Sequence, residues 1–189
     1  MTSPRLLATR SRLASVALDL FESQGYHATS VNDIASAAGV SHMTFFRHFP
    51  TKEAVLIDDP YDPVIAAAVA AQPSTLPVIE RIARGLQVVA ATMGDAISSE
   101  SRRRLVIAAT VPELRRAMAE NTRRTEEAIV RVCRADGTDA LDARIAAAAC
   151  LAALTAALLA WAKSRKGARL HDVITRALRT VVPALAMPS

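Results

Sequence analysis

The sequence predicts an all-α protein, with a small N-terminal domain of three helices over residues 1–57 and a larger helical domain over residues 58–189. Apolar residues make up 51% of the chain but aromatic residues only 4%, so the core must be built mainly from Ala, Leu, Val and Ile. Apolar positions recur at helical spacing, and no segment shows a convincing strand alternation. Alanine, the strongest helix former, dominates the composition.

The first helix is predicted over residues 5–24. Its apolar stripe follows i, i+3, i+4, i+7 and i+8 spacing and comprises Leu13, Val16, Ala17, Leu20 and Phe21. Gly25 then ends the helix. Three arginines near its start, Arg5, Arg10 and Arg12, allow two interpretations. They contact nucleic-acid phosphates, or they form an ordinary solvated helix end.

Residues 29–49 predict two short helices joined by a glycine turn. The apolar face of the first helix comprises Val31, Ile34, Ala35 and Ala38. Either Thr29 or Ser30 would cap the start of this helix. Gly39 follows it, at a place where a left-handed backbone favours glycine, and Ser41 would cap the second helix.

The second of these helices would be anchored to the core by Phe45 and Phe49, which are four residues apart. Two interpretations fit the turn chemistry equally well. One is a helix-turn-helix, whose second helix enters the major groove of DNA, and the other is a plain helical hairpin.

A short fourth helix is predicted after Pro50, with Thr51 as its cap and Lys52 at its start. The ammonium group of Lys52, beside the free N–H groups of that helix start, would suit a phosphate. The helix should end near Ile57, because the sequence DDPYDP at residues 58–63 cannot continue an ordinary helix.

Six further helices complete the prediction. They run over residues 63–71, from a Ser74 cap to about Gly94, from about Ser98 to Thr110, from Pro112 to about Ala135, from an Asp139 cap to before Gly167, and from about Leu170 to Leu185. The last two helices carry more apolar surface than a small monomer needs. They are therefore expected to pair with the same helices of a second copy in a homodimer.

Composition excludes several classes of function. The net charge is +5, but residues 1–57 carry five cations against four carboxylates, so bulk charge does not mark a DNA-binding surface. Cys133 and Cys150 are too far apart for a metal knuckle or a redox pair, and no two histidines are three to five residues apart. The chain also lacks a glycine-rich phosphate loop. No metal, cofactor or enzymatic activity is therefore expected.

Residues 145–162 form an uncharged stretch long enough to span a membrane. Ten of these eighteen residues are alanine, which contributes little to membrane insertion, so a helix packed against protein is the favoured interpretation. Arg10 and Arg12 interrupt the N-terminal apolar residues, so no signal peptide is predicted there. We expect a cytoplasmic protein that does not bind membranes.

Residues 8–57 resemble the DNA-binding region of the TetR family of bacterial transcriptional regulators. The resemblance lies in a glycine–aromatic pair, a Thr-Ser-Val helix start, an I-A-x-x-A-G-V-S turn, the sequence T-F-F-x-H-F and a T-K-E helix start. The matching residues are Gly25, Tyr26, Thr29, Val31, Ile34, Ala35, Ala38, Gly39, Val40, Ser41, Thr44, Phe45, Phe46, His48, Phe49, Thr51, Lys52 and Glu53. The chain departs from the family at the helix break after Ile57, and at Phe46, where many relatives carry tyrosine.

The resemblance implies a DNA-binding regulator, a dimeric repressor of a palindromic operator that a small effector releases. The residues expected to contact DNA are Thr29, Ser30, Ser41, His42, Met43, Thr44, Phe46, Arg47, His48 and Lys52. Of these, His42, Met43 and Thr44 begin the second helix and are the candidates for base contacts. Phe46 lacks the hydroxyl with which a tyrosine would bind phosphate.

The effector pocket is expected among apolar residues of the larger domain that are equally plausible as ordinary core. They are Leu86, Val89, Met93, Leu105, Met118 and Trp161. The C-terminal half resembles the mycofactocin-associated regulators, which implies an acyl-CoA or another amphipathic ligand. The alternative to a regulator is a helical adaptor that binds protein through its hairpin.

Overall fold

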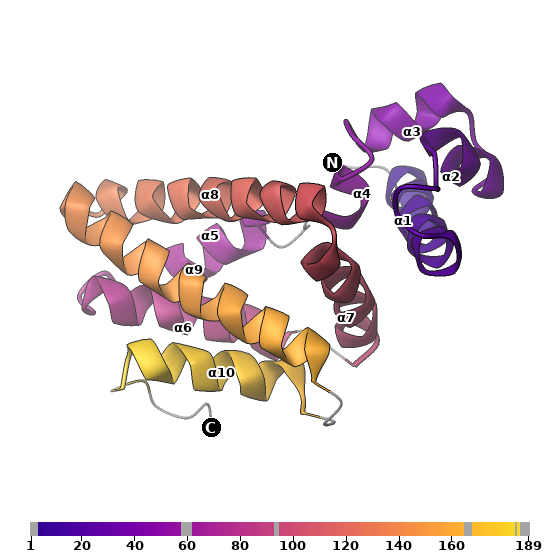
Figure 1. The fold of residues 1–189 in the computed structure, drawn as a ribbon. Helices are drawn as coiled ribbons and strands as arrows, with labels where there is room; N and C mark the ends of the chain where they lie inside the picture. The colour runs from indigo at the N-terminus through magenta and orange to yellow at the C-terminus, as the bar shows by residue number, and fades with distance from the viewer. Residues whose placement is uncertain (1–3, 58–61, 93–94, 165–167, 184, 186–189) are drawn as a thin grey trace. The chain divides into compact units, whose positions relative to one another are not determined.

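The computed structural model describes residues 4–57, 62–92, 95–164, 168–183 and 185, and in these residues it contains α-helices and no strand. The chain folds as two compact units, drawn in Figure 1. The N-terminal unit comprises residues 1–59 and 106–118, and the C-terminal unit comprises residues 60–105 and 119–189.

The N-terminal unit is built from the first four described helices, together with the segment 106–118, where α7 (Asp95–Thr110) ends and α8 (Pro112–Ala135) begins. The four helices are α1 (Pro4–Gln24), α2 (Val31–Ala37), α3 (His42–His48) and α4 (Ala54–Ile57). Helix α1 packs against α2 and α4, and α2 packs against α3. The buried Phe21, Phe45 and Phe49 form one apolar cluster with residues that include Leu13 and Leu114.

The boundary of this unit differs from the predicted domain of residues 1–57. Residues 106–118 also belong to it, because Ala108, Val111 and Leu114 are buried in the same apolar cluster as α1 to α4. The sequence does not reveal this, because their partners lie more than fifty residues earlier in the chain.

The C-terminal unit is built on helices α5 (Asp62–Ala70), α6 (Val78–Ala91), α9 (Ala140–Lys163) and α10 (Leu170–Val181), with the remainder of α7 and α8. Helix α6 packs against α5, α9 and α10, and α9 also packs against α10 (Figure 1). Gly85 permits the close approach of α5 and α6, since a Cβ there would lie 2.8 Å from the backbone nitrogen and Cα of Val69.

Arg81 is a buried cation that joins three parts of this unit. Its Nε donates to the carbonyl of Val69 at 3.2 Å, and its Nη2 lies 2.5 Å from Oδ2 of Asp136. Asp136 follows the end of α8, whereas Arg81 and Val69 lie on α6 and α5. The charge is thus buried with a partner, which avoids the cost of an isolated buried ion.

Most predicted helices are confirmed, although α4 begins at Ala54 and not at Lys52, and α7 begins at Asp95 and not near Ser98. The predicted start of α6 and the predicted end of α10 were wrong for one shared reason. Helix α6 begins at Val78, not after a Ser74 cap, and α10 ends at Val181 before reaching Leu185. In both places a proline intervenes: Leu76 precedes Pro77, and Val182 precedes Pro183. The proline ring disfavours helical backbone in the residue before it, and Val182 accordingly has φ −126° and ψ 83°.

Candidate functional site

The start of α2 is fixed by a capping box. Ser30 is the N-cap residue, and its Oγ accepts a hydrogen bond from the backbone N–H of Asp33 at 3.1 Å. The Asp33 carboxylate accepts bonds in return from the Ser30 hydroxyl and the Ser30 backbone N–H, at 2.7 and 2.8 Å. These hydrogen bonds lower the pKa of Asp33 below its ordinary value. Of the two predicted caps, Ser30 is therefore the one used.

The turn that follows has the predicted chemistry. Gly39 has φ +64°, in the left-handed region, and Ser41 caps α3 by accepting from the backbone N–H of Thr44 at 3.1 Å. The Ser41 and Thr44 hydroxyls also lie 2.9 Å apart. Phe45 and Phe49 are buried as predicted and anchor α3 to the core. Helix α3 is thus held at its start by hydrogen bonds and along one face by aromatic packing.

The opposite face of α3 lies in solvent and carries four of the predicted DNA contacts. His42, Met43, Phe46 and Arg47 are all exposed, whereas Thr44 and His48 are half-buried. Met43 is 72% exposed and Phe46 is 40% exposed. The rings of His42 and Phe46 meet at 4.8 Å between centroids, with their planes at 64°. The structure therefore brings these four side chains together on one short helix.

Two of the predicted contacts are engaged inside the unit. Thr29 is buried, and its hydroxyl donates to the carbonyl of Gly25 at 2.9 Å. Lys52 Nζ donates to the carbonyls of Tyr26 and Thr29, at 2.9 and 3.0 Å, and lies 4.0 Å from the centre of the Tyr26 ring. Lys52 therefore joins the start of α4 to the loop between α1 and α2, with two of its three N–H groups committed to that loop.

Tyr26 reinforces this connection through its hydroxyl, which donates to Oε1 of Glu53 at 2.5 Å. Burial, followed by the bond to Glu53, raises the pKa of Tyr26 far above its ordinary value. Burial would also raise the pKa of Glu53. The hydrogen bonds that its carboxylate accepts outweigh that effect and lower it. The glycine–aromatic pair and the T-K-E sequence thus interlock, a role that the sequence pattern did not reveal.

Arg10, one of the three arginines near the start of the chain, has a defined structural role. Its Nη1 donates to the carbonyl of His48 at 2.5 Å, and its guanidinium lies 4.2 Å from the centre of the Phe49 ring. His48 is the last residue of α3, so Arg10 provides a hydrogen-bond donor for that helix end. Partial burial lowers the pKa of His48, and the charges of Arg47 and Arg10 lower it further.

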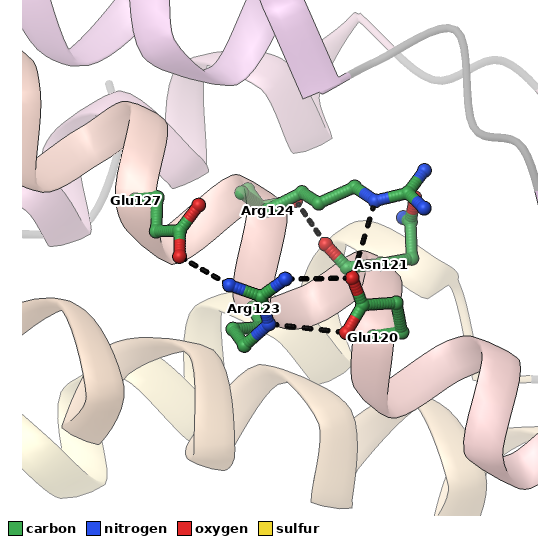
Figure 2. A network of polar contacts seen from close by, with 6 residues as sticks. Glu120, Asn121, Arg123, Arg124 and Glu127 are labelled. Carbon is green, nitrogen blue, oxygen red and sulfur yellow. Dashed lines mark hydrogen bonds and ion pairs between the residues drawn. The ribbon is translucent and has the colours of Figure 1, made fainter.

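The arginine-rich segment of α8 does not add a second basic surface at its centre. Figure 2 shows Arg123 between two glutamates of the same helix, with Nη2 2.7 Å from Oε1 of Glu120 and Nη1 bonded to Glu127. Arg124 Nε also lies 3.5 Å from Glu120. These exposed pairs cancel much of the local charge and contribute little to stability.

The predicted effector-binding residues are not brought together as a set. Leu86, Leu105 and Trp161 pack in the apolar cluster of the C-terminal unit, and Val89 is buried on α6. Met118 packs instead with the N-terminal cluster. Met93 lies outside the described residues.

Four buried polar atoms of the C-terminal unit have no hydrogen-bond partner among the described residues. They are Nε2 of Gln87, Nε of Arg104, Nδ1 of His171 and Oγ1 of Thr175. Gln87 lies on α6, while His171 and Thr175 lie on α10, which packs against α6. A buried polar atom without a partner costs free energy, so a ligand that supplied the missing bond would be favoured there. Sequence patterns carry no signal for these positions.

Helix α9 is long and apolar enough to cross a membrane, by length and composition alone. Only 33% of its most apolar stretch is buried within the protein. Its outward side includes Leu141 and Ile145, which are 64% and 58% exposed, together with the exposed Ala148 and Ala152. The helix therefore presents an apolar surface that its own unit does not cover.

The described chain thus combines a glycine-turned helix pair, which exposes one face of its second helix, with a separate helical unit. This combination is that of a helix-turn-helix protein with a helical companion domain. The chain belongs to the TetR family of bacterial regulatory proteins. Residues 13–58 match the family described as bacterial regulatory proteins, tetR family, and residues 76–186, more than half of the chain, match the MftR C-terminal domain. The family consists of regulators and not of enzymes, which confirms the prediction on that point.

Named relatives match the helix-turn-helix region. The chain is 49% identical over 53 residues to the HTH-type transcriptional regulator TcmR of Streptomyces glaucescens, an alignment that covers 28% of this chain and 24% of TcmR. It is 39% identical over 51 residues to the putative mycofactocin biosynthesis transcriptional regulator MftR of Mycobacterium tuberculosis, covering 27% and 26% of the two chains. The matched stretch is thus about a quarter of each relative's length.

The fold as a whole is also shared with a solved structure. Thermus thermophilus FadR, a TetR-family transcriptional repressor in complex with lauroyl-CoA, superposes with a TM-score of 0.52 at 21% identity. The alignment covers 95% of this chain and 96% of FadR. At this identity the likeness establishes the fold.

Proposed function

We propose that the protein is a ligand-responsive DNA-binding transcriptional regulator, a cytoplasmic repressor that binds a palindromic operator as a homodimer. The observation that carries this proposal is the exposed face of α3. Its anchored side is buried through Phe45 and Phe49, and its free side holds His42, Met43, Phe46 and Arg47. A short helix fixed in this way matches the recognition helix of a helix-turn-helix, which enters the major groove.

The proposed DNA contacts divide by how the side chains are placed. His42, Met43, Thr44 and Arg47 are the candidates for base edges, with Arg47 also able to bind phosphate. Ser30, Ser41 and His48 lie at the ends of α2 and α3, where they would position the DNA backbone. We assign Thr29 and Lys52 mainly to holding α2 and α4 in place, because their polar atoms bond to carbonyls of the same loop.

The homodimer is supported by the uncovered side of α9. Two recognition helices must lie roughly 34–36 Å apart, or a multiple of this, to reach successive major grooves of a palindrome. Pairing of α9 and α10 with the same helices of a second copy would cover Leu141, Ile145, Ala148 and Ala152. Ile145→Glu is expected to give a monomer by sedimentation, whereas Ile145→Leu should remain a dimer.

The effector is proposed to be small and apolar or amphipathic, such as an acyl-CoA. FadR, which shares the fold, binds lauroyl-CoA, and the unpartnered polar atoms of Gln87 and Thr175 offer hydrogen bonds within an apolar unit. The effector would release DNA by binding better to a conformation in which the two recognition helices no longer fit successive grooves. A thermal-shift screen of fatty acids, acyl-CoA esters and small apolar compounds would reveal such a ligand.

The decisive experiment is selection of bound fragments from genomic or random DNA, followed by affinity measurements on the selected sequence. We expect a palindromic site whose affinity falls steeply between 50 and 200 mM salt as counterions are released. Arg47→Gln should weaken binding and flatten this salt dependence, while Arg124→Gln, on the paired surface of α8, should change neither.

The alternative is a helical adaptor that binds another protein through the same helix pair. An apolar protein contact would show little salt dependence, and no DNA sequence would be enriched in the selection. The exposed methionine and phenylalanine of α3 are compatible with this alternative. The family to which the chain belongs favours DNA.

A further inference from the structure

The exposed face of α3 is unusually apolar for a helix in contact with water. Met43 is the most exposed large apolar side chain among the described residues, at 72%, and Phe46 is 40% exposed. The two residues are three apart and therefore share one face of the helix. Isolated apolar residues on surfaces are ordinary. Two of them on the face proposed to enter the major groove call for a chemical explanation.

Neither side chain can read bases by strong hydrogen bonds. The thioether of methionine is at most a weak acceptor, and the phenylalanine ring has no donor. In the major groove the four base pairs differ in their donors and acceptors, and the 5-methyl of thymine is the apolar group presented there. Cytosine and uracil carry only hydrogen at the corresponding carbon. A methyl group is therefore the one feature of the groove that suits an apolar partner.

The position of Phe46 is also fixed before any DNA arrives. Its ring meets the His42 ring at 4.8 Å and the buried Phe45 ring at 5.4 Å, both in edge arrangements. A ring held on two sides loses little conformational freedom on binding. Arg47, exposed on the same helix, supplies the positive charge that draws this face to a polyanion. The apolar side chains would suit contact with base edges in the groove, and the cation beside them would suit the phosphates of the DNA backbone.

We propose that Met43 and Phe46 recognise thymine 5-methyl groups in each operator half-site, so that the protein distinguishes thymine from cytosine and uracil by apolar contact. This inference rests on the proposed function, because it needs α3 to lie in the major groove. It assigns specificity to the two residues on this face that lack strong hydrogen-bonding groups.

The test uses the full-length protein and the operator found by selection, in which single thymines are replaced by deoxyuridine. Each replacement removes one methyl group and leaves every hydrogen bond of the base pair unchanged. At the thymines that meet Met43 or Phe46, binding should weaken about fourfold per methyl, the value of one buried methyl-sized group. When thymines are replaced in both half-sites, the fold-changes in affinity should multiply. Replacements outside the half-sites should not change the affinity.

Variants locate the contact on the protein. Met43→Leu should keep the sensitivity to deoxyuridine, whereas Met43→Gln should lose it at one position in each half-site while still binding DNA. Val88→Gln, an exposed apolar residue of α6, serves as the matched control and should behave like the wild type. If Met43→Gln and Phe46→Gln both retain the full sensitivity, the assignment to these residues is wrong.

The outcome separates this inference from the function on which it rests. Specific operator binding with no response to any deoxyuridine would overturn the methyl recognition and leave the regulator intact. Failure to enrich any DNA sequence would instead overturn the regulator itself.

Discussion

The two units of the chain satisfy their buried polar groups differently. In the N-terminal unit the buried Thr29 hydroxyl, the Lys52 ammonium and the Tyr26 hydroxyl all bond to defined partners within the unit. In the C-terminal unit Gln87, His171 and Thr175 each keep a buried polar atom without a partner among the described residues. Both units are helical and contain apolar cores, so the difference lies in polar satisfaction.

This difference corresponds to two tasks. A unit that must present one rigid face to DNA gains from having every polar group bonded, because such networks specify a single conformation. A unit that must bind a small molecule gains from leaving bonds for the ligand to complete, at a cost in stability of its own. The N-terminal unit is thus organised around a fixed surface, and the C-terminal unit retains polar atoms that a ligand would satisfy.

The largest expected effect comes from the aromatic anchor of the N-terminal unit. Phe45→Ala would leave a cavity at a fully buried ring and should destabilise that unit by about 3–5 kcal/mol. Phe46→Ala removes the same atoms from the neighbouring, exposed position and should cost under about 1 kcal/mol. Thermal unfolding followed by circular dichroism measures both variants.

If the N-terminal unit presents a rigid face to DNA, the loss of stability in Phe45→Ala should also reduce DNA binding. Phe45→Ala should lose operator binding at temperatures where the C-terminal unit is still helical. Phe46→Ala should remain folded, with weaker binding that arises from the lost DNA contact alone. Equal destabilisation by the two substitutions would contradict the separation between the anchored and exposed faces of α3.

A smaller effect on stability is expected from a substitution of Lys52. The same substitution distinguishes a structural role of Lys52 within the unit from a direct contact with DNA phosphate. Lys52→Met keeps an unbranched side chain and removes the ammonium group, with its hydrogen bonds to two carbonyls and its contact with the Tyr26 ring, which should cost roughly 1–3 kcal/mol. Operator affinity should fall because α2 and α4 are less well held. The slope of log affinity against log salt should stay unchanged.

A direct phosphate contact predicts a different result. Removing one such contact reduces the magnitude of that slope by about 0.9. A reduction of this size in Lys52→Met would show that the sequence-based assignment to DNA backbone was correct. Arg47→Gln, measured in parallel, gives the slope change expected for a solvent-facing cation.

Local features of the sequence predicted the N-terminal unit well. The caps at Ser30 and Ser41 and the left-handed Gly39 act over three or four residues, so their chemistry is visible in the sequence itself. The buried side of α3 likewise follows from helical spacing. In the predicted stripe of α1, Leu13, Ala17 and Phe21 are buried and Val16 and Leu20 are half-buried, and the stripe missed the buried Leu18. The Asp139 cap of α9 was confirmed as well. The predicted break after Ile57 falls mainly on residues 58–61, which lie outside the described residues.

Features that depend on tertiary packing were not predictable. The carbonyls that hold Lys52 come from a loop more than twenty residues earlier, and no spacing rule links them. The same holds for Met118, which packs with the N-terminal core. The misplaced start of α6 and end of α10 are different, because the restriction imposed by Pro77 and Pro183 was present in the sequence and outweighed the apolar pattern.

A still smaller effect on stability is expected when a buried threonine is replaced by valine, once in each unit. The two substitutions should change the stability in opposite directions. Thr175→Val removes a buried hydroxyl that has no partner and should stabilise the protein by about 1 kcal/mol. Thr29→Val is equally buried but removes the bond to the Gly25 carbonyl, so it should destabilise by about 1 kcal/mol. Urea unfolding of both variants checks the comparison.

The same pair of variants also tests the role proposed for the unpartnered atoms. If Thr175 supplies a bond to the effector, Thr175→Val should bind a ligand from the thermal-shift screen more weakly although the protein itself is more stable. Destabilisation by Thr175→Val would show that this hydroxyl already has a partner, and the contrast between the units would then fail at this position.

The smallest expected effect is a pH dependence that arises at the end of α3. Burial, with the nearby Arg47 and Arg10, holds the pKa of His48 below the ordinary value of about 6.5. Above that value His48 is neutral in both the folded and the unfolded chain, so its contribution to stability is fully present. As the pH falls below 6.5, the unfolded chain takes up a proton first, and the contribution is lost towards the lower folded pKa.

The wild type should therefore lose stability between pH 7.5 and 5.5 relative to His48→Gln, by under about 1 kcal/mol for a residue still partly in solvent. Urea unfolding of the two proteins at both pH values measures the difference. If His48→Gln loses as much stability as the wild type, burial and the charges of Arg47 and Arg10 do not lower the pKa of His48 enough to affect the stability of the protein.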